Sequence, residues 1–497
     1  MLAQRHVDNL KEIVGEKFVS TDEFEMLCYS RDLAASIPDD LLKSYGMIGA
    51  EAAVLPGDTE QISKILAYAN RHDIPITTRG AGSWALGGTL PMEGGIVIDT
   101  ARFEKILEFN ENDGYIRAQS GVEWKRLVDL AEKKGLVVGA NPSSGASATV
   151  GGYISTGGGA GIGLAEYGSV GNQVVSLKVV LADGRIIETD PWSTHYFVGN
   201  EGTLGIITEA VIKVYPFPGR KHYMFGVDPM GKGVELLAKA TALRPYYVSF
   251  LNRGLLSMIN EAKGHHTKEC DLTISLAFNG TKKMLEKIDG QVKEIFAGTH
   301  EFDEEEAKEE WKERYRIGLA FKKLGPSLMA QDFRVPLASV KETLQELEAI
   351  CKGDRWGAES LAGENDSVIL AVMILADERD SADYIRKFAY AKDLGDLAKR
   401  MKGAPFGLGL HNAIHLNDLY EPRAVDTLKR IRKHFDPINI LNPSKTTQAR
   451  IPQEFINLSM MFMRGIPEVV GLGLKVAAAL PSELTRFGLR IIGSGIK

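Results

Sequence analysis

Three glycine-rich segments carry the clearest chemical pattern in the sequence. They are RGAGSWALGG at residues 79–88, NPSSGASATVGGYISTGGGAGIGLAEYGSVGN at 141–172 and NEGTLGII at 200–207. Glycine lets a backbone approach a flat ligand closely, and consecutive free N–H groups in a concave loop bind an anion such as pyrophosphate. The serines and threonines between the glycines supply hydroxyl partners without bulk. We therefore predict that the segments fold around a ligand and do not act as flexible linkers.

The first segment superficially matches the dinucleotide fingerprint of a Rossmann fold, because Gly80, Gly82 and Ala85 follow a predicted strand and Asp99 lies downstream. A Rossmann loop runs directly into a helix whose N-terminus faces the pyrophosphate. Residues 86–91, LGGTLP, cannot propagate such a helix. We reject the Rossmann interpretation and expect an anion cradle that is formed by the loop itself.

The second half of the chain offers an arginine and two histidines as candidate site residues. Arg314 lies in EEWKERYR, and a guanidinium fork suits a carboxylate because it makes two parallel charge-assisted hydrogen bonds. The alternative for Arg314 is a surface ion pair in a charged helix. His411 and His415 are four residues apart, which puts both imidazoles on one side of a helix or a strand. A neutral imidazole can take a proton from an alcohol near neutral pH.

The overall composition excludes several classes of protein. A chain of 497 residues allows roughly two to four domains. Its 59 basic and 65 acidic residues do not indicate a nucleic-acid binder. The three cysteines are too far apart for a zinc finger or an iron–sulfur cradle. The sequence shows no secretory signal pattern and no run of 18 uncharged apolar residues, so we expect a cytoplasmic protein without a spanning helix.

The elements that must position these residues alternate between short apolar runs and helical patterns, which predicts an α+β fold. Residues 52–78 predict a strand, a helix capped near Asp58 or Thr59, and a second strand. The run VYPFPGR at 214–220 indicates a domain boundary. Beyond it, the pattern to about residue 375 predicts an antiparallel sheet covered by helices. Further predictions are strands at 95–99, 115–120, 174–181 and 206–214 and a helix at 123–134.

The order and the amino-acid sequences of the three segments resemble those of the FAD-binding fold shared by vanillyl-alcohol oxidase, para-cresol methylhydroxylase and the D-lactate and glycolate dehydrogenases. The matching stretches are ITTRGAGS, the block from ANPSSG to VVLADG, VGNEGTLGIITEA and, near the end, FDPINILNPSK. The resemblance implies a two-subdomain FAD-binding domain followed by a cap domain with an antiparallel sheet and helices. In chain order we expect an N-terminal helical segment at 1–44, the FAD-binding domain at 45–218, the cap at 219–405, a C-terminal return to the FAD-binding domain at 406–450 and an amphipathic tail at 451–497.

In that family the first loop binds the FAD pyrophosphate, the second surrounds the flavin ring and ribityl chain, and the third borders the adenine and diphosphate. Family members that bind FAD covalently commonly carry a histidine at the position of Ser83, so the resemblance implies dissociable FAD unless a cap residue attaches it. By position, the resemblance implicates in FAD binding Arg79, Gly80, Ala81, Gly82, Ser83, Trp84, Pro142, Ser143, Thr149, Gly151, Gly152, Ser155, Gly158, Gly159, Tyr167, Gly168, Glu201, Gly202, Ile206, Ile207, Asn442 and Lys445.

The resemblance also suggests a carboxylate clamp. Arg314 matches the W-x-x-R stretch of the 2-hydroxy-acid dehydrogenase branch, where it would hold the substrate carboxylate. The lysine that this branch often carries two residues before a strand aspartate is Ala330 here. The clamp is therefore incomplete, and we expect Arg316 or Arg334 to substitute.

The histidine pair has a counterpart in the same branch. His415 and Asn417 match its G-D-G-N-x-H-x-N element, whose histidine lies beside the flavin and in several members binds a divalent metal. The later E-H-G motif that supplies another metal ligand is missing here. We therefore expect no metal, and we expect His415 or His411 to take the alcohol proton directly.

We predict an FAD-dependent oxidoreductase acting on CH–OH donors, which oxidises a small 2-hydroxy acid of the D-lactate or glycolate type. One alternative is the oxidation of a phenolic or aromatic alcohol, as in vanillyl-alcohol oxidase, because the C-terminal part is shortened. Another is a flavoprotein electron-transfer subunit whose substrate site has degraded, as the incomplete clamp suggests. Related dehydrogenases often associate with an iron–sulfur subunit or an electron-transferring flavoprotein. The apolar tail at 451–497 is a candidate for docking on such a partner or on the inner face of the membrane, unless it packs on its own domain.

Overall fold

The structure is a computed structural model. Two predicted site residues, Gly159 and His411, lie outside the residues that it describes, and so does the tail at 451–497. The described residues are 2–33, 48–84, 86–158, 161–264, 267–316, 321–325, 327–362, 367–377, 379–388, 390–410 and 412–448.

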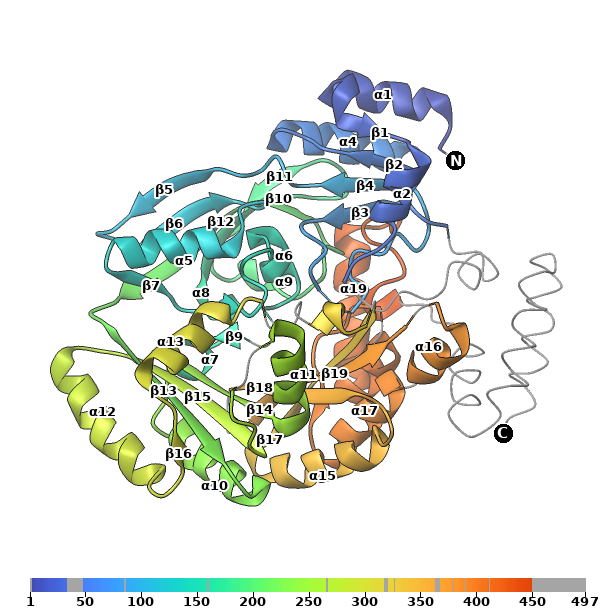
Figure 1. The fold of residues 1–497 in the computed structure, drawn as a ribbon. Helices are drawn as coiled ribbons and strands as arrows, with labels where there is room; N and C mark the ends of the chain where they lie inside the picture. The colour runs from blue at the N-terminus through green and yellow to red at the C-terminus, as the bar shows by residue number, and fades with distance from the viewer. Residues whose placement is uncertain are drawn as a thin grey trace.

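The first sheet carries the first glycine loop at the end of β3, and its strand order is β1-β2-β4-β3 (Figure 1). Strands β2, β4 and β3 run parallel, because helix α4 crosses over between β2 and β3. The Asp58 side chain caps α4 by accepting a hydrogen bond from the Gln61 backbone N–H at 2.8 Å. The predicted strand–helix–strand unit is confirmed. The bounds are α1 (Gln4–Val14), η1 (Glu16–Phe18), β1 (Val19–Ser20), α2 (Glu23–Tyr29), β2 (Ala52–Val54), α4 (Thr59–Arg71), β3 (Ile76–Arg79) and β4 (Ile96–Asp99).

The second sheet is antiparallel, with strand order β11-β10-β12-β6-β5 and β7 paired to the far end of β12. Helix α5 packs against it through the buried Trp124, whose indole N–H donates to the Ala140 carbonyl at 3.0 Å. The helix ends before Gly135, as predicted, and Gly135 adopts a φ of 72° that favours glycine. The bounds are β5 (Ile106–Asn110), β6 (Tyr115–Gln119), α5 (Trp124–Lys133), β7 (Leu136–Val138), β10 (Val174–Val180), β11 (Ile186–Glu188), α9 (Thr194–Phe197) and β12 (Ile206–Pro216).

The described residues of the second glycine segment fold into short elements beside the second sheet. The Thr149 side chain caps α6 by accepting a hydrogen bond from the Gly152 backbone N–H at 3.3 Å. The short helix α7 has a glycine at each end: it begins after Gly163 and ends before Gly168. The bounds are β8 (Asn141–Pro142), α6 (Val150–Ser155), β9 (Gly161–Ile162), α7 (Leu164–Tyr167) and α8 (Val170–Gln173).

An eight-stranded antiparallel sheet, here called the cap sheet, follows from Arg220, and it confirms the predicted sheet-and-helix architecture. Its strand order is β16-β13-β15-β14-β18-β19-β17-β20. Side chains on β17 alternate: Phe333 and Val335 pack with the outer helices, whereas Ala330 and Asp332 face the other way, toward the glycine loops. The strands are β13 (Arg220–Val227), β14 (Tyr247–Asn252), β15 (Leu272–Asn279), β16 (His300–Glu301), β17 (Ser327–Pro336), β18 (Trp356–Ala362), β19 (Ser367–Ala376) and β20 (Ala404–Pro405).

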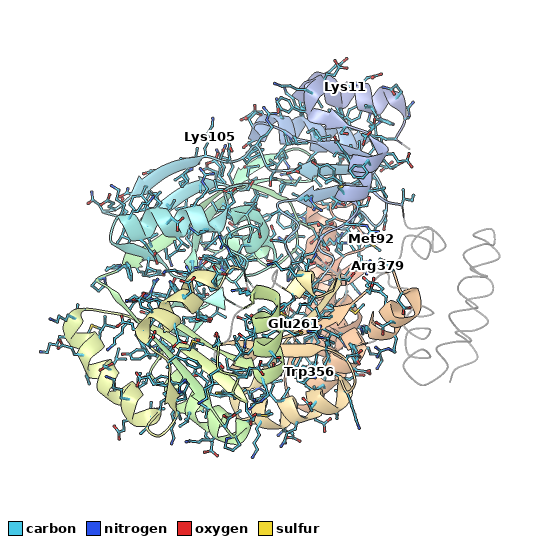
Figure 2. All side chains as sticks on the ribbon, viewed as in Figure 1. Lys11, Met92, Lys105, Glu261, Trp356 and Arg379 are labelled. Carbon is cyan, nitrogen blue, oxygen red and sulfur yellow. The ribbon has the colours of Figure 1, made fainter. Side chains whose placement is uncertain are left out.

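Helices cover both faces of the cap sheet. Helices α10, α12, α15 and α17 contribute to the outer core, while α11 and α13 lie on the side of the glycine loops (Figure 1). Figure 2 shows the side chains that fill the space between these layers, and its label Glu261 marks helix α11. The bounds are α10 (Met230–Thr241), α11 (Arg253–Lys263), α12 (Lys282–Ile295), α13 (Glu304–Glu313), η2 (Phe321–Lys323), η3 (Leu337–Ser339), α15 (Val340–Ile350), α16 (Ser381–Phe388) and α17 (Tyr390–Arg400).

The chain then returns to the first sheet. The Ile76 backbone N–H on β3 donates to the Ile440 carbonyl at 2.8 Å, and the Asn442 backbone N–H donates to the Ile76 carbonyl at 2.7 Å. Arg432 is buried and donates to the carbonyls of Leu441 and Lys445, both at 3.0 Å. These bonds fix the returning segment beside the first glycine loop. The bounds are η4 (Asn412–His415), α18 (Leu416–Leu419), α19 (Pro422–Phe435) and η5 (Thr446–Gln448).

Within the described ranges, no helix combines the length and the apolar character that a membrane crossing requires.

Candidate active site

A cavity of about 580 Å³ connects the glycine loops to the cap sheet. It is lined at one end by the first and second glycine loops, and at the other by side chains from the cap sheet, from η2 and from the turn that follows α13. The sequence predictions that the structure places on this cavity are Gly80, Ala81, Gly82, Ser83, Trp84, Pro142, Ser143, Thr149, Gly151, Gly152, Ser155, Glu201, Gly202, Ile206, Ile207, Asn442 and Arg314.

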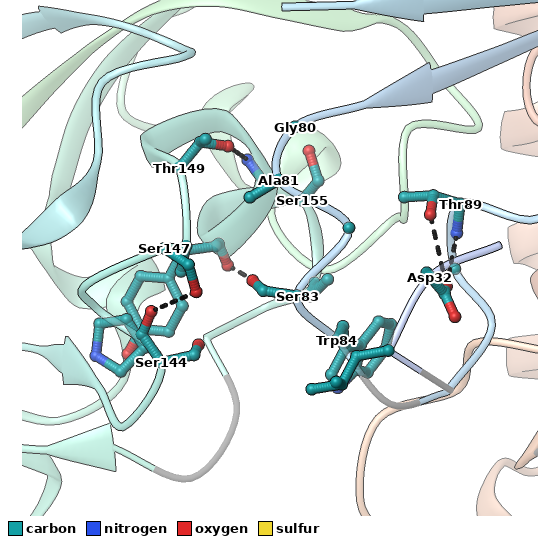
Figure 3. A pocket seen from close by; sticks show the side chains of 18 of the residues that line it. Asp32, Gly80, Ala81, Ser83, Trp84, Thr89, Ser144, Ser147, Thr149 and Ser155 are labelled. Carbon is teal, nitrogen blue, oxygen red and sulfur yellow. Dashed lines mark hydrogen bonds between the residues drawn. The ribbon is translucent and has the colours of Figure 1, made fainter. Parts of the chain in front are cut away.

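The first glycine loop packs closely against the second. A Cβ atom on Gly80 would lie 2.3 Å from the Thr149 hydroxyl oxygen, so no larger residue fits without movement. Gly82 has a φ of 62°, in the left-handed region that favours glycine. Figure 3 shows Gly80 and Ala81 facing Thr149 and Ser155 in the pocket. The two loops therefore present backbone and small hydroxyl groups to the same space.

The third glycine segment and the C-terminal return close the cavity together. The Asn442 side-chain amide donates to the Gly88 carbonyl at 3.1 Å and to the Glu201 carbonyl at 2.7 Å. One Glu201 carboxylate oxygen accepts a hydrogen bond from the Gly409 backbone N–H at 2.6 Å. Burial raises the pKa of Glu201 to about 7. Asn442 thus joins three segments that are far apart in the sequence.

Four residues that the resemblance assigned to FAD lie off the cavity and support its loops instead. The Arg79 guanidinium donates to the Arg31 carbonyl at 2.5 Å. The Lys445 ammonium donates to the Leu90 carbonyl at 2.8 Å, and burial lowers its pKa to about 8. The Tyr167 ring packs on the Tyr215 ring at a centroid distance of 4.5 Å. Gly158 packs against Val170.

Gly168 also lies off the cavity. Its φ of 79° favours glycine at the end of α7. Its contribution is therefore to turn the backbone of the second glycine segment.

Several lining residues had no counterpart in the sequence prediction. Asp32 is one of them: its carboxylate accepts hydrogen bonds from the backbone N–H and the hydroxyl of Thr89, both at 3.3 Å (Figure 3). Asp32 and Thr89 are 57 residues apart in the chain. No local motif links them, so sequence spacing gave no signal for this contact.

Arg314 lies on the cavity and is held between two aromatic rings. Its guanidinium carbon is 3.7 Å from the centroid of the Trp311 ring and 4.2 Å from that of the Tyr315 ring. It donates to the Tyr315 hydroxyl oxygen at 3.1 Å and to the Trp311 carbonyl. That hydroxyl oxygen also accepts a hydrogen bond from the Asn141 amide at 2.6 Å. Arg314 is therefore positioned from both sides of the cavity, and among the described residues it forms no ion pair.

The two arginines expected to complete the clamp do not line the cavity. Arg316 is exposed and pairs with Glu313 at 3.3 Å. Arg334 is also exposed, and its guanidinium lies 5.3 Å from the centroid of the Phe406 ring. Among the described residues, the second cation on the cavity is instead Lys322, which the sequence prediction did not name.

Two carboxyl groups, the first half-buried and the second buried, line the cap-sheet end of the cavity. They are Asp332 on β17 and Glu359 on β18. Burial raises the pKa of Asp332 to about 7. Burial, together with the neighbouring Glu310 and Asp332, raises the pKa of Glu359 to about 8. The sequence prediction missed Glu359, although a single acidic residue in the apolar strand WGAESLA was an available signal.

His415 is not among the residues that line the cavity. It is buried, with only 3% of its surface exposed. A Cβ atom on Gly395 would lie 2.2 Å from its Nε2 atom, so the imidazole packs against α17. The backbone of 412–415 turns in the short helix η4, which the repeat of two histidines at a spacing of four did not indicate.

Two protein-family models match the chain. One is described as "FAD binding domain" and matches residues 50–190, and the other is described as "FAD linked oxidases, C-terminal domain" and matches residues 220–446. The chain belongs to the FAD-linked oxidases. It is an oxidoreductase that acts on CH–OH donors with FAD as its cofactor, as the sequence predicted.

Curated relatives of this FAD-linked oxidase cover most of its length. The glycolate oxidase subunit GlcD of Bacillus subtilis is 29% identical over 418 residues, which are 80% of this chain and 88% of the relative. A D-lactate dehydrogenase of Archaeoglobus fulgidus is 29% identical over 427 residues, 80% of this chain and 91% of the relative. p-Cresol methylhydroxylase with bound substrate has a TM-score of 0.76 at 16% identity and covers 89% of this chain and 96% of its own. This last likeness shows the fold.

The residues on the cavity fit FAD. Gly80 packs closely on Thr149, and the first glycine loop offers backbone N–H groups that suit the pyrophosphate of FAD. The hydroxyls of Ser143, Thr149 and Ser155 line the continuation of the same space. The cavity continues beyond the glycine loops to Arg314.

We expect Gly80→Ala to weaken FAD binding by roughly tenfold or more, because overpacking of a close contact costs about 1–3 kcal/mol. The added methyl group would meet the Thr149 hydroxyl and displace the first loop. The measurement is the flavin absorbance per protein after purification and the affinity of the apoprotein for added FAD.

Gly290→Ala in α12 is the matched control, since nothing lies within 4 Å of a Cβ atom at Gly290. It should leave flavin content unchanged and keep or slightly raise stability. Equal flavin content in the Gly80 and Gly290 variants would contradict the assignment of the first loop to FAD.

Proposed function

We propose that this FAD-linked oxidase oxidises a small 2-hydroxy acid of the D-lactate or glycolate type. The observation that carries the proposal is Arg314, which is fixed between Trp311 and Tyr315 on the cavity that the glycine loops also line. A guanidinium binds a carboxylate through charge-assisted hydrogen bonds. When FAD is bound, it supplies the acceptor for the hydride that leaves the alcohol carbon. Relatives named glycolate oxidase subunit and D-lactate dehydrogenase support the same substrate class.

We also propose that FAD is bound without a covalent bond. The first loop presents the Ser83 hydroxyl where covalent members of the resembling family carry a histidine. The loops hold the cofactor through Gly80 to Ser83 and Thr149 to Ser155, which offer hydrogen-bonding groups but no such histidine. Acid precipitation should therefore leave the yellow colour in the supernatant. Colour that stays with the precipitated protein would contradict the proposal.

The substrate is oriented by charges of opposite sign. Arg314 and Lys322 are the cationic side chains on the cavity, and they hold the carboxylate. Asp332 faces the same space and accepts the proton of the substrate hydroxyl, because burial raises its pKa to about 7 and a base works best when its pKa is near the working pH. This role passes from the histidines to Asp332, since His415 packs against α17 and His411 lies outside the described residues.

The electrons are passed on to a partner redox protein in this proposal. The three cysteines, at positions 28, 270 and 351, are too far apart in the sequence for an iron–sulfur motif. The tail at 451–497 remains our candidate for docking on an iron–sulfur or electron-transferring flavoprotein subunit, or on the inner face of the membrane. If deletion of the tail leaves both associations unchanged, the tail has no part in them.

We expect Arg314→Lys to raise KM for 2-hydroxy acids by roughly 10- to 100-fold, because hydrogen bonds to charged groups contribute about 1.5–3 kcal/mol. Lysine keeps the charge but loses the planar fork and the stacking on Trp311 and Tyr315. The measurement is steady-state oxidation with an artificial dye as electron acceptor. Arg316→Lys, on the exposed neighbour that pairs with Glu313, is the control and should leave KM unchanged. Equal KM values in the two variants would contradict the clamp.

We expect the rate of substrate oxidation to rise with pH and to level off above about pH 7. The carboxylate form of Asp332 is the base, and its fraction grows as pH rises through the raised pKa. Asp332→Asn should lower the rate by about 10²- to 10⁴-fold and remove this rise. The measurement is the pH profile of flavin reduction at saturating substrate.

Asp377→Asn is the control for Asp332→Asn, because Asp377 pairs with Arg379 outside the cavity. It should keep both the rate and the profile. A full rising limb in the Asp332→Asn protein, with normal flavin content, would assign the base to another residue.

A further inference from the structure

Glu359 is a buried carboxyl group that faces the cavity and has no hydrogen-bond partner among the described residues. Only 7% of its surface is exposed, and it accepts no hydrogen bond from a described residue. Burying a polar group without a partner is unfavourable, so nearly all such groups in folded proteins are paired. Because the Glu359 carboxyl opens onto the cavity, a bound ligand can supply its partner.

The cap sheet places Glu359 in one row with a second acid. Asp332 on β17 and Glu359 on β18 both pair with Ala371 on the intervening strand β19. Residues that are paired across strands point to the same face, and adjacent strands are about 4.8 Å apart, so the two acids are roughly 10 Å apart at their Cα atoms. The small Ala371 side chain between them also lines the cavity. We call these three residues the acidic row.

A third acid and several cations lie near the acidic row. Glu310 on α13 accepts a hydrogen bond from the Tyr247 hydroxyl at 3.1 Å, and burial raises its pKa to about 7. It is close enough to Glu359 to raise the pKa of that group. Of the nearby cations, Arg314 is stacked between rings, Lys263 pairs with Glu313 at 2.9 Å, and Lys322 lines the same cavity. Among the described residues, none of the three forms an ion pair with Glu359.

We propose that Glu359 binds an ammonium group, so that the preferred substrate is a 2-hydroxy acid with a positively charged amino group at the end remote from its carboxylate. This rests on the proposed function, in which Arg314 holds the carboxylate and Asp332 faces the hydroxyl. An ammonium group has three N–H donors and would give Glu359 the partner that it lacks. An alkyl end would leave the carboxyl unpaired, and a second carboxylate would be repelled by the acidic row.

The direct test measures binding of inert acids to the oxidised holoenzyme. The probes are ω-amino acids of three to five carbons, such as 4-aminobutanoate, with pentanoate as the neutral match and glutarate as the anionic match. They lack a 2-hydroxyl group and cannot be oxidised at that position. We expect the best ω-amino acid to bind at least about tenfold tighter than its neutral and anionic matches, as expected for a buried charge pair. The flavin difference spectrum reports the affinity.

Proton release provides a second readout that does not depend on catalysis. The pKa of Glu359 is raised to about 8, so the group is mostly protonated at pH 7 in the free enzyme. An ammonium group favours the carboxylate and lowers this pKa, and binding then releases up to about one proton. Calorimetry in two buffers of different ionisation enthalpy measures the release, which pentanoate should not produce.

Glu359→Gln keeps the shape of the side chain and removes its charge. It should abolish both the preference for the ω-amino acid and the proton release, while pentanoate binds as before. Glu310→Gln is the matched control, since Glu310 belongs to the same buried group of acids but does not line the cavity; it should keep the preference. The proposal is overturned if pentanoate or glutarate binds wild-type enzyme as tightly as every ω-amino acid, or if the preference survives Glu359→Gln.

Flavin reduction separates this inference from the proposed function. The substrates are 4-amino-2-hydroxybutanoate, 2-hydroxypentanoate and 2-hydroxyglutarate, and we expect the first to have the highest rate at low concentration. If 2-hydroxypentanoate is the best substrate, the proposed function stands and the ammonium site is overturned. If none of the three reduces the flavin, the proposed function fails, and the binding of the inert acids still decides the role of Glu359.

Discussion

The hydrogen bond between the Asn141 amide and the Tyr315 hydroxyl, 2.6 Å long, joins the second glycine loop to the turn that follows α13. The substrate end of the cavity depends on it. Tyr315 packs so closely on the second loop that a Cβ atom at Gly145 would lie 2.8 Å from its ring. The same tyrosine carries the Arg314 guanidinium on its face. One contact therefore fixes both the position of the candidate clamp and its distance from the loops that hold FAD.

Burial sets the chemistry at the cap-sheet end. In water, carboxyl groups with the ordinary pKa of Asp and Glu would all be charged at neutral pH. In the cavity, burial raises the pKa of Asp332 to about 7 and that of Glu359 to about 8. The charge on Glu359 therefore depends on what binds beside it. The same low polarity strengthens the attraction of Arg314 for a carboxylate. A ligand with charges of both signs therefore satisfies groups that are otherwise buried at a loss of stability.

The sequence was sufficient for the parts of the site that are local in the chain. The glycine loops were predictable because close backbone approach and positive φ values require glycine, as at Gly80 and Gly82. The acidic row was not, because strand pairing through Ala371 brings Asp332 and Glu359 together, and single-sequence patterns do not give strand order. The spacing of His411 and His415 predicts that both side chains share one side of an element, but it does not predict which element packs against them. In the fold, α17 packs against His415.

The central claim is that the cavity presents a 2-hydroxy acid, held at Arg314, to FAD. The most direct test mixes the purified flavoprotein anaerobically with the two enantiomers of 2-hydroxy acids and, separately, with 4-alkylphenols, while the flavin band near roughly 450 nm is followed. Our account predicts that at least one 2-hydroxy acid bleaches the band completely and that the phenols leave it unchanged. Bleaching by the phenols alone would contradict the account and would assign the enzyme to the oxidation of aromatic substrates.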